Sequence, residues 1–162
     1  MKPSIILALS AIFFALTALS ALAGEVMVTD SWIRAAPPNA PALGVFMKLE
    51  NHTESGIALV EVQVSIEVDR IELHRTMMVN GIMKMTPQIA ISVAAQSAVV
   101  LKPGSWHIML ISPKKVPVVG ERVGLTLIFD DGSEREISAV VRKGEMAMNH
   151  NHEVKSMEST AD

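Results

Sequence analysis

The chain has 162 residues, a formal net charge of −3 and no cysteine. This length indicates one domain or two small ones. The weakly acidic balance, without basic blocks, argues against nucleic acid as the main partner. The lack of cysteine excludes disulfides, zinc sites built on cysteine pairs, thiol nucleophiles and the usual blue-copper electron-transfer centre, which needs a thiolate ligand.

Residues 1–23 have the pattern of a secretory signal peptide. Lys2 precedes an uncharged apolar run over 5–23, which ends in Ala21-Leu22-Ala23, a small-residue cleavage pattern before Gly24. We therefore expect a mature chain from Gly24 onward that is exported to a bacterial periplasm. Because the run is near membrane-spanning length, an uncleaved anchor helix is the alternative.

Alternation of apolar and polar residues dominates the rest of the chain and predicts strands. In chain order, strands are expected at 25–34, 43–50, 57–64, 70–74, 89–93, 98–102, 106–112, 123–129 and 136–142. Asn80-Gly81 favours a tight type I′ hairpin between the 70–74 strand and a methionine-rich strand that follows. Many short strands at this spacing predict an all-β sandwich or small barrel over 24–143. Over 144–162 the apolar pattern stops, and we expect a disordered tail rich in His and Met.

The predicted 106–112 strand displays a histidine and a methionine together. Residues two apart in a strand point to the same face, so His107 and Met109 project together, while Trp106, Ile108 and Leu110 point the other way. The second set is the natural core face. The His107 and Met109 pair is therefore expected on the outer face or at a strand end, and alternation places His74 on the outer side of its own strand.

Imidazole and thioether groups together form a soft ligand set. It suits Cu(I), and it suits Zn²⁺, Mg²⁺ or Ca²⁺ poorly. Methionine and histidine also avoid the disulfide formation that cysteine would undergo in an oxidising compartment. Each residue alone has a plainer explanation: a strand methionine such as Met27 or Met47 is usually core filler, and a lone strand histidine is usually a surface residue. The combination favours a metal site.

The spacing of these residues resembles a known family. His74, ten intervening residues, Met85, twenty-one intervening residues and then His107-Ile108-Met109 are similar to the copper-binding signature of PCuAC-type periplasmic copper chaperones. The runs Leu101-Lys102-Pro103-Gly104 and Gly124-Leu125-Thr126-Leu127 also resemble the family. The resemblance extends over about residues 25–142.

This resemblance implies an all-β, cupredoxin-like fold, a Greek-key β-barrel or sandwich, with Cu(I) at an exposed site of two His and two Met. Carried over by position, the ligands are His74, Met85, His107 and Met109. Family members often have a Met directly after the first His, where this chain has Arg75. The auxiliary ligands are therefore expected elsewhere, at Met77 or Met83. Alternation turns Trp106 toward the core rather than over the ion.

The predicted tail contains a second group of soft ligands, Met146, Met148, His150 and His152. The histidines suit Cu(II) and the methionines suit Cu(I). One hypothesis is a flexible second copper site that captures copper for the main site. The alternative is a solvated tail with no role.

The sequence thus predicts a monomeric periplasmic Cu(I) metallochaperone that is not an enzyme. It has no G-x-S-x-G, no H-E-x-x-H and no glycine-rich phosphate loop. The family resemblance implies delivery to the binuclear copper centre of cytochrome c oxidase, on the oxidase's copper-centre subunit, and cooperation with a Sco-type thioredoxin-fold copper protein. A copper-buffering or resistance protein without dedicated delivery is one alternative. A plain adhesive β-domain is another, and it predicts that the four main ligands do not converge in space.

Overall fold

The computed structural model describes residues 25–144. These residues form ten β-strands and contain no α-helix. The strands are β1 (Val26–Arg34), β2 (Ala42–Asn51), β3 (Ile57–Val64), β4 (Arg70–Val79), β5 (Ile82–Gln88), β6 (Ile91–Val93), β7 (Ser97–Leu101), β8 (Trp106–Ile111), β9 (Arg122–Phe129) and β10 (Glu134–Arg142). Within the described part of the chain, no helix is long and apolar enough to cross a membrane.

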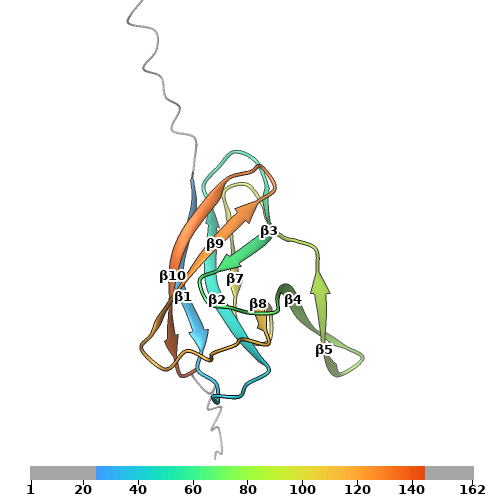
Figure 1. Cartoon of the computed structure of the whole chain (residues 1–162). Helices are drawn as coiled ribbons and strands as arrows, with labels where there is room; N and C mark the ends of the chain where they lie inside the picture. Colours follow the sequence, from blue (N-terminus) through green and yellow to red (C-terminus); the bar gives the residue numbers. More distant parts are fainter. Residues whose placement is uncertain (1–24, 145–162) are drawn as a thin grey trace, which may run out of the picture.

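All ten strands belong to one sheet, which wraps around a single core (Figure 1). Their order is β5-β4-β8-β7-β2-β1-β10-β9-β3-β6, and β8 also pairs directly with β2. Most neighbours are antiparallel, whereas β1 runs parallel to β10 and β7 runs parallel to β8. Because β8 contacts both β4 and β2, its side chains lie at the centre of one half of the sheet.

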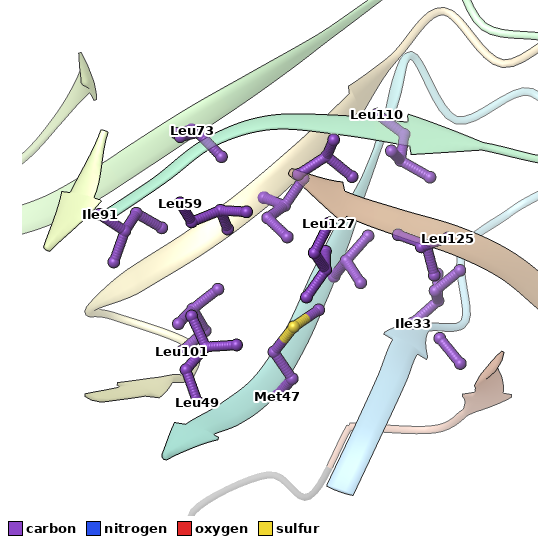
Figure 2. Close-up of a cluster of buried hydrophobic side chains, with 14 of the residues drawn as sticks. Ile33, Met47, Leu49, Leu59, Leu73, Ile91, Leu101, Leu110, Leu125 and Leu127 are labelled. Carbon is purple, nitrogen blue, oxygen red and sulfur yellow. The ribbon is translucent and has the colours of Figure 1, made fainter. Parts of the chain in front are cut away.

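The core is made by the alternating apolar residues that the sequence predicts. In β9 every second residue is buried, from Val123 to Phe129, while the residues between them are exposed or half-buried. Figure 2 shows Met47 of β2 among leucine and isoleucine side chains in this core. Met47 is thus the core filler that was expected, but Met27 is half exposed on β1, so that expectation is wrong for Met27.

The predicted hairpin at Asn80-Gly81 is confirmed. Both residues have positive φ, 51° and 77°, as a type I′ turn requires, and Val79 pairs with Ile82 across the turn. The strand expected at 70–74 continues to Val79, because β5 pairs with it beyond the point where β8 begins. The hairpin consequently projects from the body of the sheet, with β5 as an edge strand (Figure 1).

Candidate metal centre

His74 and His107 lie opposite each other on neighbouring strands. They are direct partners in the antiparallel pairing of β4 with β8, and their ring centroids are 5.7 Å apart at an interplanar angle of 66°. Ile108 and Leu73, also paired across these strands, face the core. The two histidines therefore project from the outer face of the sheet, as strand alternation predicts.

Hydrogen bonds fix the tautomer of each ring. His74 Nε2 lies 2.7 Å from Glu72 Oε2, and His107 Nδ1 lies 2.9 Å from the Ser105 carbonyl oxygen. Both partners are acceptors, so each of these nitrogens carries the proton and donates it. The lone pairs are left on His74 Nδ1 and His107 Nε2. This is how outer-shell groups orient metal-binding histidines.

The two lone-pair nitrogens are buried and have no hydrogen-bond partner among the residues that the structure describes. Three buried side-chain polar atoms within residues 25–144 lack a hydrogen bond: His74 Nδ1, His107 Nε2 and Ser133 Oγ. Leaving such an atom unpaired costs about 1–3 kcal/mol, so most buried polar groups are satisfied. Here two unpaired nitrogens lie on neighbouring imidazole rings, and a metal ion could bind both of them.

The carboxylate beside His74 is held ionised. Hydrogen bonds from Arg70 and, next, from His74 lower the pKa of Glu72. An ionised carboxylate accepts hydrogen bonds only, so it keeps the proton of His74 on Nε2 at neutral pH. Arg70, which bonds Glu72 and not His74, thus stabilises the tautomer of His74 indirectly.

His107 is far more buried than an exposed site would suggest. Only 4% of the residue is accessible, and the Phe46 ring of β2 lies 6.3 Å from its ring. Burial is the main cause that lowers the pKa of His107, and the neighbouring His74 ring and Arg34 guanidinium act in the same direction, against the hydrogen bond to the Ser105 carbonyl. The expectation of an exposed site is therefore wrong for this residue, because the outer face is covered here by the aromatic side chain of another strand.

Phe46 belongs to a layer that sequence reasoning missed. Its ring stacks against Trp32 at 4.6 Å, and the Arg34 guanidinium lies 5.5 Å from its centroid. Both aromatic residues are buried although they lie on the outer face, paired across β1 and β2. Gly44 makes room for the ring, since a Cβ there would be 2.9 Å from Phe46 Cζ.

The predicted methionine ligands share the face of the histidines. Met109 follows His107 by two residues in β8 and is half-buried opposite Glu72. Met85 lies on β5 opposite Thr76, two residues from His74 along β4, and is 51% exposed. The structure therefore places all four predicted ligands on one face of three adjacent strands, β5, β4 and β8.

The auxiliary residues divide between the two faces of the hairpin. Met83 lies on the face of Met85, opposite Met78. Met77 pairs with Lys84 on the other face, so the structure does not bring it to the histidine pair. Met146, Met148, His150 and His152 lie outside the described residues. Trp106 is on the inner face, half-buried against the core under the Arg75 guanidinium at 4.9 Å, as expected.

The chemistry of this face depends on neutral nitrogen and sulfur atoms. Nowhere in residues 25–144 do three His, Cys, Asp or Glu residues gather closely enough to hold a metal ion by themselves. A metal at His74 and His107 would need further ligands of another kind, and the thioethers of Met85 and Met109 lie on the same face. Two imidazoles and two thioethers select a soft, low-charge ion rather than Zn²⁺, Mg²⁺ or Ca²⁺.

The chain is similar to bacterial proteins of one family. The family described as "Putative lipoprotein LpqE-like" matches residues 26–141. A relative from Leifsonia xyli subsp. xyli, named "Putative lipoprotein Lxx21020", is 32% identical over 121 residues, which are 74% of this chain and 71% of the relative.

Solved structures share the fold. The copper-bound PCuAC domain from PmoF2 has a TM-score of 0.63 at 23% identity, over 75% of this chain and 96% of that domain. CuI-DR1885 from Deinococcus radiodurans has a TM-score of 0.59 at 29% identity, over 76% of this chain and 82% of that chain. The cupredoxin-like fold and the resemblance to PCuAC-type proteins are confirmed. The chain belongs to the LpqE-like family.

Proposed function

We propose that this protein is a Cu(I) carrier of the cell envelope that binds the ion at His74, Met85, His107 and Met109. The observation that carries the proposal is the pair of buried nitrogens, His74 Nδ1 and His107 Nε2, which lie on neighbouring rings and have no hydrogen-bond partner among residues 25–144. The proteins of similar fold include a copper-bound domain and a CuI form, which supports copper as the ion. Soft ligands without any thiol favour Cu(I) over harder ions.

The graded exposure of the ligands suits a carrier better than an enzyme. His107 is buried at 4% accessibility, the His74 side chain is 13% exposed, and Met85 on the edge strand is 51% exposed. A partner's ligand can therefore replace Met85 first, while the two histidines still hold the ion. Stepwise ligand exchange of this kind moves Cu(I) without releasing it and needs no acid–base catalyst.

The direct test is an anaerobic Cu(I) titration of the 24–162 chain against a chromophoric chelator. We expect His107→Ala with Met109→Ala to weaken binding by more than the roughly tenfold to hundredfold effect of outer-shell mutations. The matched control is His52→Ala with Met27→Ala, which removes the same residue types from exposed positions. Equal affinity in wild type and the site variant would refute the assignment.

Delivery is a separate part of the proposal. We propose that the acceptor is the copper-centre subunit of cytochrome c oxidase, with a Sco-type thioredoxin-fold protein as partner, and that the carrier works as a monomer in the periplasm after removal of residues 1–23. The test is transfer of Cu(I) from the loaded carrier to each purified acceptor in the presence of a chelator that captures free ion. Tight binding without transfer to either acceptor would favour the buffering or resistance role instead.

The position of Gly144 favours a role for the tail that follows it. A Cβ on Gly144 would lie 3.0 Å from Arg34 Nε, and the Arg34 guanidinium covers Phe46, the neighbour of His107. Gly144, the last residue that the structure describes, is thus linked to His107 through the side chains of Arg34 and Phe46. We propose that the chain after Gly144, with its His and Met residues, captures Cu(I) or Cu(II) for the two-histidine site. Truncation after Gly144 should lower copper stoichiometry, and unchanged stoichiometry in both oxidation states would refute this role.

A further inference from the structure

The tip of the β4–β5 hairpin exposes two methionines that the two-histidine site does not use. Met78 is 63% and Met83 is 57% exposed, and the flanking Val79 and Ile82 are exposed as well. Exposed apolar side chains gathered at one place mark a binding function more often than isolated ones do. Since β5 is the edge of the sheet and pairs with β4 alone, no other strand in the described part of the chain covers this tip.

The turn sets these two methionines directly opposite each other. In a type I′ turn the Val79 carbonyl accepts a hydrogen bond from the Ile82 N–H, so the next pair, Met78 and Met83, is a non-hydrogen-bonded pair. Such pairs bring Cα atoms to about 4.5 Å and their side chains close together. Pro87, which has no N–H to donate, falls opposite His74 at another non-hydrogen-bonded position, in agreement with this alternation.

Met83 lies along the sheet toward the histidines. Its Cε is 3.8 Å from the place that a Cβ on Gly104 would take, in the turn between β7 and β8. The next residue, Ser105, accepts hydrogen bonds from His107 Nδ1 and from the Thr76 N–H. The Met83 side chain thus crosses β4 on the face of Met78 and His74, and reaches the turn that holds His107.

We propose that Met78 and Met83 form a second Cu(I) site, made of thioethers alone, from which Met85 passes the ion to His74 and His107. Same-face residues two apart are about 7 Å apart along a strand, so Met85 lies one step from the tip and one step from His74. Methionine has three rotatable bonds, which let its sulfur swing between neighbouring positions. This proposal rests on the proposed function.

The transfer step is a ligand exchange and leaves the oxidation state unchanged. A bond from Met85 sulfur to copper forms as a bond from Met78 or Met83 sulfur breaks, and the histidine nitrogens then replace the remaining thioether. The ion stays Cu(I), no electron is exchanged, and thioethers carry no proton to release. Two thioethers hold the ion less strongly than a set with two imidazoles, so the direction of transfer runs from the tip to His74 and His107.

The experiment is an anaerobic titration of the 24–162 chain, labelled with ¹³C-methyl methionine, with Cu(I) added as its acetonitrile complex. We expect the methyl signals of Met85 and Met109 to shift with the first equivalent. Those of Met78 and Met83 should then shift together with a further equivalent. The tail methionines give signals of their own, so binding there is counted separately.

The variant Met78→Leu with Met83→Leu keeps the apolar surface and removes only the sulfurs. It should lose one equivalent of Cu(I) and load the two-histidine site several-fold more slowly, with unchanged affinity for the first ion. The control, Met27→Leu with Met77→Leu, removes two exposed methionines from elsewhere, one of them on the opposite face of the same hairpin, and should keep both equivalents.

Two results would overturn the proposal. One is full stoichiometry and unchanged loading in the tip variant. The other is a shift of Met83 with the first equivalent while Met78 stays silent, which would assign Met83 to the two-histidine site. In both results Met85 and Met109 still respond, so the proposed function survives. If Met85 and Met109 do not respond to copper, the proposed function fails and the tip site, which delivers to it, fails with it.

Discussion

Removal of the Phe46 ring tests the link between the aromatic layer and the buried histidine. Phe46→Ala deletes a buried ring that stacks on Trp32, lies under Arg34 and covers His107. Replacing a buried Phe by Ala costs about 3–5 kcal/mol. We expect about 3 kcal/mol, the lower end of that range, because an arginine at the surface covers one side of this ring rather than core side chains.

Two measurements on the copper-free protein check this expectation. For a domain of about 120 residues, an unfolding entropy of about 2.1 cal/mol/K per residue converts 3 kcal/mol into a fall in Tm of about 12 °C. NMR titration of the ring protons should show that the pKa of His107 rises toward its ordinary value, since burial is the main cause of its depression. Leu127→Ala, buried in β9, is the control: its Tm should fall comparably while the pKa of His107 stays in place.

The two readouts can fail separately. A fall in Tm of less than about 4 °C, or roughly 1 kcal/mol at this size, would mean that the ring does not pack as the structure has it. A large fall in Tm with an unchanged pKa of His107 would mean that other side chains bury the histidine. The second result would refute the argument that the aromatic layer creates the environment of this ligand.

Three further substitutions test other parts of the structure. Gly44→Ala should destabilise the protein in urea by about 1–3 kcal/mol, because the added Cβ collides with the Phe46 ring, and a neutral effect would show that the ring can move aside. Glu72→Ala should weaken Cu(I) binding about tenfold to hundredfold in chelator competition. Glu50→Ala, which breaks the part-buried ion pair with Lys48 and has no hydrogen bond to His74 or His107, should not. Asn51→Leu should cost about 3 kcal/mol in thermal unfolding, since the buried amide donates to three backbone carbonyls, and a loss under 1 kcal/mol would contradict this.

Local sequence patterns predicted the strands and the faces of the sheet well. Alternation predicts β9 correctly because one face of this strand is buried and the other is not. Asn80-Gly81 predicts the turn correctly because few residues other than Asn and Gly adopt positive φ at two successive positions. Alternation does not tell what covers the outer face. The burial of His107 depends on Phe46, which precedes it by about sixty residues and meets it only through the pairing of β8 with β2.

The predicted end of the 70–74 strand was too early, and this affected the choice of Met77 as an auxiliary ligand. The expected strand stopped at residue 74, which left Met77 and Met78 without a defined orientation. Counting back from the Asn80-Gly81 turn pairs Met78 with Met83 and Met77 with Lys84, so the turn itself contained the signal that was missed. A two-residue hairpin fixes register completely, and register decides which methionines lie beside His74.

The two histidine rings are held in fixed orientations by their own hydrogen bonds. Glu72 holds the His74 ring, and the Ser105 carbonyl holds His107 beneath Phe46, so neither imidazole can rotate to find another partner without losing a hydrogen bond. An ion that binds these nitrogens therefore gains two preset ligands with little further ordering, which is the source of affinity in preorganised sites. The methionine on the edge strand is not held in this way. Under the proposed function, fixed orientation at the two histidines and exposure at Met85 would give the ion two held ligands and one that can yield to a partner.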